Sequence, residues 1–288
     1  MYGIFWGCQI PRRLPHIEAS TRLVLQRLKI DFKDLKNAIC CPDPIVNRVM
    51  EPLKLLSISS FNIASAQAAG ANAIATPCNG CYASLSRASE QIESPEVLSR
   101  LNILLHPFDL KITSHLNVKH IVDILFENKD RIAAMIDKPL KGLRVATHLG
   151  CHFFSGEHIH DMKKTCTMID QIVEVLGAQP VGYSLKSMCC GGSLRGYSED
   201  LMESMILRKI FSAKEARAHC LVTACPLCIL NLDGKQKVIE RKMKLQMGLP
   251  VMALQEIVAL AFGFNIGQIG LQYHMTDATK LLQDFHFL

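Results

Sequence analysis

The chain has 288 residues, of which 49% are hydrophobic and 20% are charged, and its formal net charge is +6. A chain of this length and composition can bury a substantial core, which excludes intrinsic disorder. The basic residues are scattered, and the one dense basic run, Lys235 to Lys244, is interpreted as the solvated face of a helix and not as a nucleic-acid patch.

The first half of the chain is predicted to alternate strands and helices. The expected elements are a strand over 2–6, a helix over 17–28, a short strand over 32–35, a helix over 53–69, a strand over 71–76 and a helix that begins near Tyr82. Gly70 is the expected C-terminal stop of the fourth of these elements.

The second half repeats this plan. The expected elements are a strand over 143–147, a helix over 162–176, a strand over 180–185, a helix over 201–218, a strand over 220–223, a helix that opens at 225–226 and an amphipathic core or interface helix over 251–262. Residues after about Phe264 form a tail. The sequence therefore predicts an α/β protein of two tandem pseudo-symmetric units, residues 1–135 and 136–288, each a small and mainly parallel sheet flanked by helices.

The cytoplasm is the predicted location. Met1 to Trp6 lack the basic region and the long apolar region of a signal peptide. No apolar run reaches the ~18 residues that span a bilayer, because Gln255 and Glu256 interrupt the best candidate. In a reducing compartment, twelve cysteines indicate metal or redox chemistry and not a disulfide framework.

Ten of the cysteines form one pattern that occurs twice. Each copy has a single cysteine, then a Cys-Cys pair, then a Cys-x-x-Cys segment. The first set is Cys8, Cys40, Cys41, Cys78 and Cys81, and the second set is Cys151, Cys189, Cys190, Cys225 and Cys228. Most of these cysteines follow predicted strands, which places them at the edge where α/β folds bind ligands.

The number of thiols in each set favours an iron–sulfur cluster over zinc. Thiolates bind both, and a Cys-x-x-Cys turn directs two sulfurs to one centre. Two adjacent cysteines reach one centre only from a bend, which Gly191-Gly192 in one copy and Pro42, followed by Pro44, in the other would supply. Five ligands exceed the four of a structural zinc site, so zinc would leave one thiol spare in each set.

The doubled pattern resembles the cysteine-rich CCG domain repeat, and the chain resembles the B subunit of heterodisulfide reductase, including the related subunits of sulfur oxidisers. The resemblance covers roughly residues 1–264. It is carried by Gly7-Cys8, Cys40-Cys41-Pro42, Cys78-Asn79-Gly80-Cys81-Tyr82, Gly150-Cys151-His152, Cys189-Cys190-Gly191-Gly192 and Cys225-Pro226-Leu227-Cys228. It implies that each set binds a noncubane [4Fe-4S] cluster, and that a disulfide or thiol-sulfur substrate is cleaved or formed between the two clusters. One departure is that the first copy reads Cys-Cys-Pro, and proline lacks an N–H that could reach a cluster sulfur.

The resemblance also implies partner subunits. The chain has no ferredoxin-type cysteine run, no Gly-x-Gly-x-x-Gly and no phosphate loop, so it should carry no flavin or nucleotide of its own. The implied partners are a ferredoxin-like C subunit and a flavin-carrying A subunit of the same complex. The implied substrate is a small thiol or disulfide, or a protein-bound lipoyl sulfur, and the sequence does not decide among them.

Two histidines are the catalytic candidates. His148 and His152 flank Cys151, and either could hydrogen-bond a cluster sulfur or protonate a departing thiolate; the alternative is that both are ordinary loop residues. Cys166 and Cys220 lie outside the pattern and are interpreted as buried packing residues.

Three alternatives are compatible with the same residues. One is an electron-relay iron–sulfur subunit of a lactate-, glycolate- or succinate-oxidising system. Another is a structural subunit held together by zinc, and a third is a protein with zinc in one site and a cluster in the other.

Overall fold

A computed structural model of the protein describes residues 1–42, 50–285 and 287, and the predicted chain break at Pro44 lies outside them. The described residues contain two four-stranded sheets in which every pairing is parallel. The first sheet has the order β2-β1-β3-β4 and the second the order β6-β5-β7-β8, so the central strands of each are flanked in the same way. The strands are β1 (Tyr2–Ile4), β2 (Phe32–Asp34), β3 (Ala73–Thr76), β4 (Asn117–His120), β5 (Arg144–His148), β6 (Gln179–Val181), β7 (Cys220–Thr223) and β8 (Val251–Ala253). The predicted fold class, two tandem units with parallel sheets and flanking helices, is confirmed.

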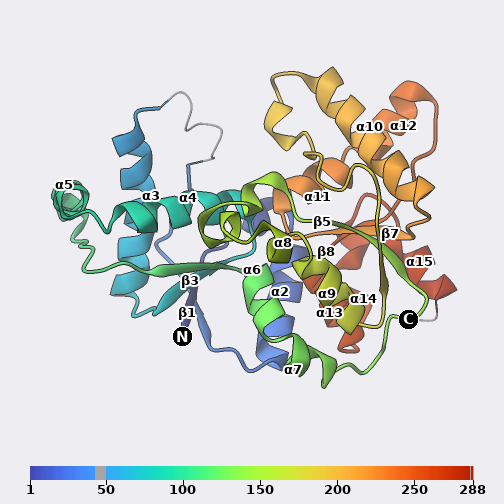
Figure 1. Ribbon diagram of the computed structural model, residues 1–288, viewed down its shortest axis with the longest axis horizontal. Helices are drawn as coiled ribbons and strands as arrows, with labels where there is room; N and C mark the ends of the chain where they lie inside the picture. Colours follow the sequence, from blue (N-terminus) through green and yellow to red (C-terminus); the bar gives the residue numbers. More distant parts are fainter. Residues whose placement is uncertain (43–49, 286, 288) are drawn as a thin grey trace.

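Helices connect the strands of each sheet. In the first unit they are α1 (Gln9–Arg13), α2 (Pro15–Arg27), α3 (Pro52–Ala68), α4 (Asn79–Gln91), α5 (Pro95–Leu105), η2 (His106–Phe108), α6 (Ile121–Glu127) and α7 (Lys129–Ala133). In the second they are η3 (Cys151–Phe153), η4 (Gly156–Ile159), α8 (Met162–Thr165), α9 (Met168–Val175), η5 (Gly192–Leu194), α10 (Glu199–Glu215), α11 (Pro226–Leu232), α12 (Gln236–Met243) and α13 (Leu254–Ala261). The tail adds α14 (Ile266–Ile269), η6 (Leu271–Tyr273) and α15 (Ala278–Asp284). Figure 1 shows the units side by side along the longest axis.

The two units pack through reciprocal contacts. Helix α2 of the first unit contacts α13 of the second, and the equivalent helices α9 and α6 make the matching contact. Helix α4 contacts η3, and their equivalents α11 and α1 also touch. Such reciprocity is the property of an isologous interface, so a pseudo-twofold axis runs between the units. The boundary between residues 135 and 136 stays a prediction.

The helices after β3 and β7 each begin one residue after a cysteine. Cys78 has extended backbone angles (φ −139°, ψ 120°) and is the N-cap of α4, and Cys225 (φ −118°, ψ 123°) is the N-cap of α11. The prediction that the first of these helices begins near Tyr82 was therefore wrong. Because the helix begins at once, the second cysteine of each Cys-x-x-Cys segment lies in the first turn, where its sulfur can turn back toward the first.

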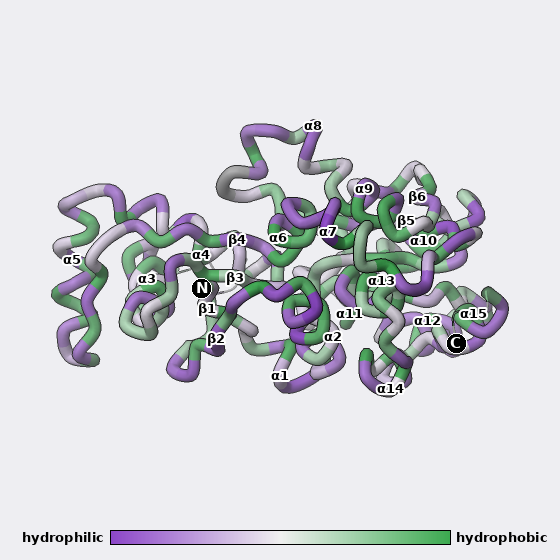
Figure 2. Tube along the Cα trace, turned by 90° about the horizontal axis from the view of Figure 1, so that it is seen from below, coloured by the Kyte–Doolittle hydropathy of each residue, from purple (hydrophilic) through white to green (hydrophobic). Residues whose placement is uncertain are grey.

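Three other predicted elements also differ from the structure. The helix expected over 162–176 is two helices, α8 and α9, separated by Cys166 and Thr167. The strand expected over 180–185 is the shorter β6, and the helix expected over 251–262 is a strand, β8, followed by α13. Every residue of β8 and α13 is buried, so the helical part of this segment lies in the core. Figure 2 shows α13 as a predominantly hydrophobic segment among the elements of the second unit, in the right-hand half of the view.

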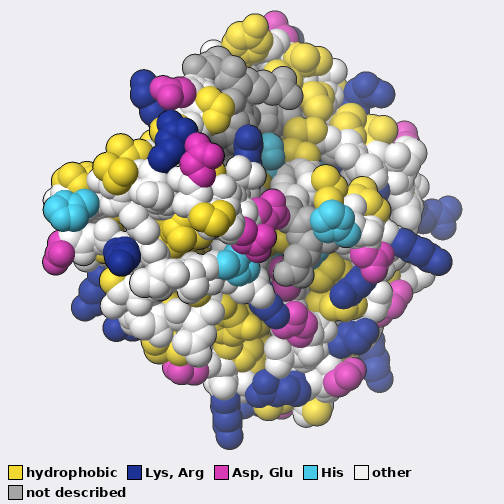
Figure 3. All heavy atoms as spheres, turned by 60° about the vertical axis from the view of Figure 1, so that its left-hand side comes forward, with side chains coloured by type: hydrophobic (Ala, Val, Ile, Leu, Met, Phe, Trp, Pro, Cys, Tyr) yellow, Lys and Arg dark blue, Asp and Glu magenta, His cyan; other side chains and the backbone are white. Residues whose placement is uncertain are grey.

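Basic side chains are dispersed over the face of the molecule that Figure 3 shows, with acidic residues between them. Residues 236–243 form α12, whose buried side chains are Gln236 and Ile239. None of the helices in the described ranges combines the length and the apolar character that a bilayer span requires.

Candidate iron–sulfur centre

The loops at the carboxyl ends of four central strands carry the cysteines that begin each motif. Cys8 and Cys78 follow β1 and β3, and Cys151 and Cys225 follow β5 and β7. Strands β1 and β3 are paired, as are β5 and β7, so each single cysteine lies beside the Cys-x-x-Cys segment of its own unit. The parallel sheets thus bring residues from separate parts of the sequence to one edge.

All five cysteines of the first set line one cavity. Its volume is about 430 Å³, and apolar side chains such as Trp6, Ile58 and Leu227 form much of its remaining wall. Cys41 Sγ lies 3.1 Å from Cys81 Sγ. Cys40 hydrogen-bonds with Cys41 and Cys8. The exposed Cys8 and Cys40 are thereby connected to the buried Cys41 and Cys81. The five thiols therefore face one enclosed space.

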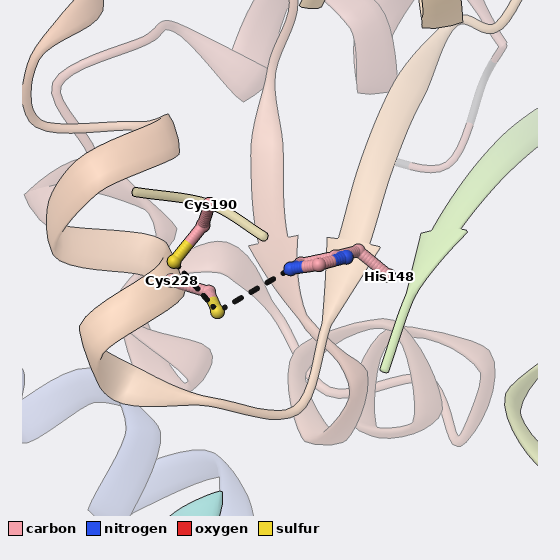
Figure 4. Close-up of side chains that lie close together, drawn as sticks. All are labelled: His148, Cys190 and Cys228. Atoms are coloured by element: carbon pink, nitrogen blue, oxygen red, sulfur yellow. Dashed lines mark hydrogen bonds between the residues drawn. The ribbon is translucent and has the colours of Figure 1, made fainter. Parts of the chain in front are cut away.

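Two sulfur–sulfur contacts bring together four cysteines of the second set. Cys190 Sγ lies 3.2 Å from Cys228 Sγ, as Figure 4 shows, and Cys151 Sγ lies 3.9 Å from Cys189 Sγ. Gly191 has a positive φ of 78° and donates its N–H to Cys189 Sγ at 3.4 Å. Glycine adopts this conformation without strain, so the Cys-Cys-Gly sequence makes the bend that directs both sulfurs inward.

The two sets touch each other at Cys78 and Cys225. The side chains of these residues hydrogen-bond across the unit interface, and each also hydrogen-bonds the other cysteine of its own Cys-x-x-Cys segment. Neighbouring thiols therefore form an unbroken series through both units. Its order is Cys8, Cys40, Cys41, Cys81, Cys78, Cys225, Cys228, Cys190, Cys189 and Cys151.

Crowding makes these thiols hard to ionise together. A hydrogen bond with Cys225 is the first cause that raises the pKa of Cys78, and a hydrogen bond with Cys41 does the same for Cys81. The pKa of Cys190 is raised to about 12 because Cys189 hydrogen-bonds it, whereas the pKa of Cys189 is lowered by its bonds with Cys151 and Cys190. Only a few of ten such sulfurs can be thiolates at once unless cations bind them, since a metal ion deprotonates the thiols that coordinate it.

This donor set fits iron–sulfur clusters better than zinc. Each set has five sulfurs joined by a continuous series of contacts, and a tetrahedral zinc site would use four of each. In the first set the space between the sulfurs is a cavity far larger than one ion requires. Iron–sulfur clusters are the soft-metal groups that need several thiolates around an extended volume.

His148 lies against the second set at the end of β5. Its Nε2 is 3.5 Å from Cys228 Sγ, and its Nδ1 is 3.3 Å from Lys209 Nζ (Figure 4 shows the ring pointing to Cys228). Burial and the charge of Lys209 lower the pKa of His148 to about 3, so the ring is neutral. His148 Nδ1 also lies 3.4 Å from Lys186 O, but the Lys209 ammonium is closer to Nδ1 and donates to that same oxygen. We therefore assign the proton to Nε2, which directs an N–H at the Cys228 sulfur.

Lys209 is a residue of this site that the sequence analysis missed. It is fully buried in α10 and donates to Leu185 O at 2.7 Å and Lys186 O at 3.1 Å, as well as to His148. These three acceptors match the three N–H groups of an ammonium. A sequence signal was present, because Lys209 continues the buried stripe of Met202 and Ile206 at helical spacing.

The remaining sequence candidates lie in different surroundings. His152 is half-buried and lines the 430 Å³ cavity beside Cys8 and Cys225. Cys220 is fully buried in β7, and burial raises its pKa to about 12. Cys166 is only partly buried, contrary to the prediction, and lines a separate cavity of about 210 Å³ with His148 and Lys186.

Cys220 is expected to contribute packing and no metal ligation. Replacing Cys220 with alanine should leave the iron and sulfide content of the protein unchanged, because its sulfur lies in a strand between apolar neighbours. The lost methylene-sized volume should lower the free energy of unfolding by about 1 kcal/mol. Iron analysis and urea denaturation measure the two effects. A fall in bound iron would contradict the assignment.

Asn79 ties the first Cys-x-x-Cys segment to the loop before Cys151. Its Nδ2 donates to Leu149 O at 2.6 Å, and both residues are buried at the unit interface. Gly150 follows with φ +85°, and a Cβ placed there would lie 2.5 Å from Asn79 Nδ2. The loop that presents Cys151 therefore requires glycine at this position.

Replacing Gly150 with alanine is expected to weaken both the unit interface and the second set. The methyl group would displace the Asn79 amide and strain a left-handed backbone, which should cost at least about 1 kcal/mol of unfolding free energy. The midpoint of urea denaturation measures the loss. Gly182→Ala is the matched control, because nothing lies within 4 Å of a Cβ there and its φ is not in the left-handed region. Equal midpoints for the two variants would contradict this role of Gly150.

The similarity to known proteins follows the same two cysteine-rich segments. The family described as "CCG: Cysteine-rich domain" matches residues 2–86 and 145–233. The B subunit of a ferredoxin/F420H2-dependent CoB-CoM heterodisulfide reductase from Methanosarcina acetivorans is 33% identical, over 97% of this chain and 95% of that protein. The chain belongs to the family of heterodisulfide reductase B subunits. The resemblance stated from the cysteine motifs is thus confirmed, with the CCG domain present twice.

The chain is also similar to a subunit of a complex that is not named as a disulfide reductase. The membrane anchor subunit of an 8-methylmenaquinol:fumarate reductase from Wolinella succinogenes is 28% identical, over 97% of this chain and 98% of that protein. A solved structure of a hypothetical protein from Helicobacter pylori superposes with a TM-score of 0.80 at 14% identity, over 96% of this chain. This chain covers 52% of that one, and the likeness concerns the fold alone. The named reductase relatives are oxidoreductase subunits that act on sulfur groups within complexes.

Proposed function

We propose that this protein is the iron–sulfur catalytic subunit of a heterodisulfide reductase or a related complex. In this proposal the first set and the second set each bind a noncubane [4Fe-4S] cluster, and a disulfide or thiol-sulfur substrate is cleaved or formed between the two clusters. The observation that carries the proposal is the contact of Cys78 with Cys225, which joins two complete five-thiol groups across the unit interface.

The position of the cavity supports a substrate site shared by the units. Its walls include every cysteine of the first set, but also Cys225, Leu227 and His152 of the second unit. A sulfur compound in the mouth of this cavity would lie against residues of both sets. The apolar wall suits an organic thiol or disulfide better than a hydrated ion.

The chain's own residues have three tasks under this proposal. The ten cysteines would bind the clusters, which would supply the two electrons that break the sulfur–sulfur bond, or accept the two electrons that its formation releases. The Nε2–H of His148 donates a hydrogen bond to the Cys228 sulfur, and Lys209 orients the ring. His152 lines the cavity from an accessible loop, where it can hold or deliver a proton for the substrate thiolate.

Partners and location belong to the same proposal. Electrons would pass to or from a ferredoxin-like C subunit and a flavin-carrying A subunit, and the substrate would be a small thiol or disulfide or a protein-bound lipoyl sulfur. The relatives named as subunits of reductase complexes support assembly with partners. The cytoplasm remains the proposed location, since it keeps ten structural thiols reduced.

One observation favours a second function. The Wolinella fumarate reductase anchor protein matches nearly the whole chain, which supports an electron-relay role in an oxidoreductase that does not act on sulfur. In that case the clusters would transfer electrons without binding a substrate sulfur.

Two measurements on the anaerobically purified chain test these proposals. After reconstitution with iron and sulfide, the protein should contain about eight iron atoms and a matching amount of acid-labile sulfide. Addition of a disulfide should then oxidise a reduced artificial dye. Zinc without sulfide would falsify the cluster proposal. Clusters that stay inert toward every dithiol and disulfide supplied would support electron relay and contradict catalysis.

A further inference from the structure

A second group of metal-ligand side chains lies away from the cysteines. His16 comes from α2, Glu256 from α13 and His274 from the tail, and one ligand atom of each lies within 4.8 Å of the others. The three residues belong to different parts of the chain, and they meet at the packing contact between α2 and α13. The group therefore spans the two units and the tail.

The geometry around Glu256 leaves one oxygen directed at both imidazoles. Glu256 Oε2 accepts the N–H of Ala253 at 2.6 Å, as a helix cap. Both oxygens lie 3.0 Å from His274 Nε2, and Oε1 also lies 3.9 Å from His16 Nε2. Ligand atoms of a tetrahedral zinc site lie about 3.3 Å apart, and the three atoms here lie within 4.8 Å of one another, so the side chains would draw together to share one ion.

His16 has no other explanation among the described residues. It is 3% exposed, and neither of its ring nitrogens has a hydrogen-bond partner. Its ring centroid lies 4.7 Å from that of His274, and a Cβ added at Gly270 would lie 2.6 Å from His16 Cβ. The tail is therefore packed tightly over an imidazole whose nitrogens make no hydrogen bond, with Glu256 Oε1 at 3.9 Å as the near acceptor, an arrangement that is unfavourable unless a ligand completes it.

A second carboxylate completes the arrangement. Asp233 Oδ2 lies 3.4 Å from His274 Nδ1, on the side of the ring away from Glu256. Metal-binding histidines commonly donate their other N–H to such a carboxylate. With a proton on His274 as the only positive charge, the two buried carboxylates leave a net negative charge, which a divalent cation would balance.

We propose that His16, Glu256 and His274 bind a divalent cation of the zinc class, with Asp233 orienting His274. Two imidazole nitrogens and one carboxylate oxygen are a ligand set that zinc accepts, and water can complete the coordination. The site is distinct from both cysteine sets. It holds α2, which follows the loop of Cys8, against the helix that precedes the tail, and thereby fixes one unit relative to the other.

The pseudo-twofold axis provides an internal control. His158 and Asp123 meet at the related packing contact, where His158 Nε2 lies 2.9 Å from Asp123 Oδ1, and Asp123 caps α6 as Glu256 caps α13. Among the described residues, no third ligand atom completes a comparable group around this pair. His158→Gln thus removes a buried histidine of similar surroundings without touching the proposed site.

Zinc content and cobalt absorption test the proposal on the full chain with its clusters reconstituted. After Zn²⁺ is added and excess removed, the wild type and His158→Gln should each retain about one zinc per chain. His16→Gln and His274→Gln should each lose it, and Asp233→Asn should weaken Zn²⁺ binding about 10–100-fold. Undiminished zinc in His16→Gln would overturn the site.

The cobalt spectrum keeps the test valid if the variants do not fold. Co²⁺ bound to the wild type should give visible bands without sulfur-to-metal charge transfer, because no thiol is among the proposed ligands. Cobalt bands that arise only with sulfur charge transfer would assign the ion to the cysteine sets and overturn the proposal. Loss of iron and sulfide with this cobalt spectrum intact would count against the proposed function alone.

Discussion

Cys225→Ser is expected to lower bound iron from about eight to about four atoms per chain and to reduce disulfide-dependent dye oxidation to background. Cys225 is the residue of the second set that touches the first, through its hydrogen bond with Cys78. Loss of its thiolate would remove one of the proposed cluster ligands and also the contact between the sets. Because the proposed chemistry needs a cluster on each side of the substrate, one remaining cluster should not turn over.

The control for this variant lies on the strand that leads to it. Cys220→Ala removes a buried thiol five positions earlier and should retain both the iron and the activity. Cys78→Ser should give the same loss as Cys225→Ser, from the other side of the interface. A Cys225→Ser protein that keeps about eight iron atoms would show that the second set is not a cluster site of the proposed kind.

Lys209→Met is expected to lower the reduction potential of the second cluster by about 60 mV or more, a tenfold change in a one-electron equilibrium. The ammonium group of Lys209 is buried and lies 3.3 Å from His148 Nδ1, while the other ring nitrogen faces the Cys228 sulfur at 3.5 Å. A nearby positive charge favours the reduced, more negative cluster, and the oriented N–H adds to this effect. Removal of the lysine therefore stabilises the oxidised form.

Redox titration followed by electron paramagnetic resonance measures this shift for each cluster. The first cluster should keep its potential, since Lys209 contacts His148, which lies against Cys228 of the second set. Lys214→Met is the matched control, because Lys214 lies on the same helix and donates to Met247 O at 2.5 Å, away from the histidine. Equal potentials in Lys209→Met and Lys214→Met would contradict the role assigned to Lys209.

The sequence predicted the architecture where periodicity and motif agreed. Strand β7 was placed correctly from a short apolar run, and the doubled cysteine pattern identified the repeat. Strand β4 and helix α5 were missed. In β4 the reason is that residues 117–120 show no apolar alternation. Strand β8 and α13 were combined into one helix because a fully buried segment shows the same continuous hydrophobicity in either conformation.

The sequence predicted the candidate ligands of the site but not the contacts between residues that are far apart in the chain. Spacing alone identified ten thiols, whereas the contact between Cys78 and Cys225 depends on how two separately folded sheets pack. Lys209 lies 61 positions from His148, and Asn79 lies 70 positions from Leu149. No local pattern links residues at such separations, because tertiary packing alone brings them together.

The reciprocal packing of the units bears on how such a chain can arise. A protein with a single unit would expose the faces of α2 and α6 that are now covered, and two copies related by a twofold axis would bury both faces at once. Such a homodimer would already juxtapose two Cys-x-x-Cys turns at its axis. Gene duplication and fusion would preserve that geometry and free each half to diverge, as Cys-Cys-Pro in one half and Cys-Cys-Gly in the other illustrate.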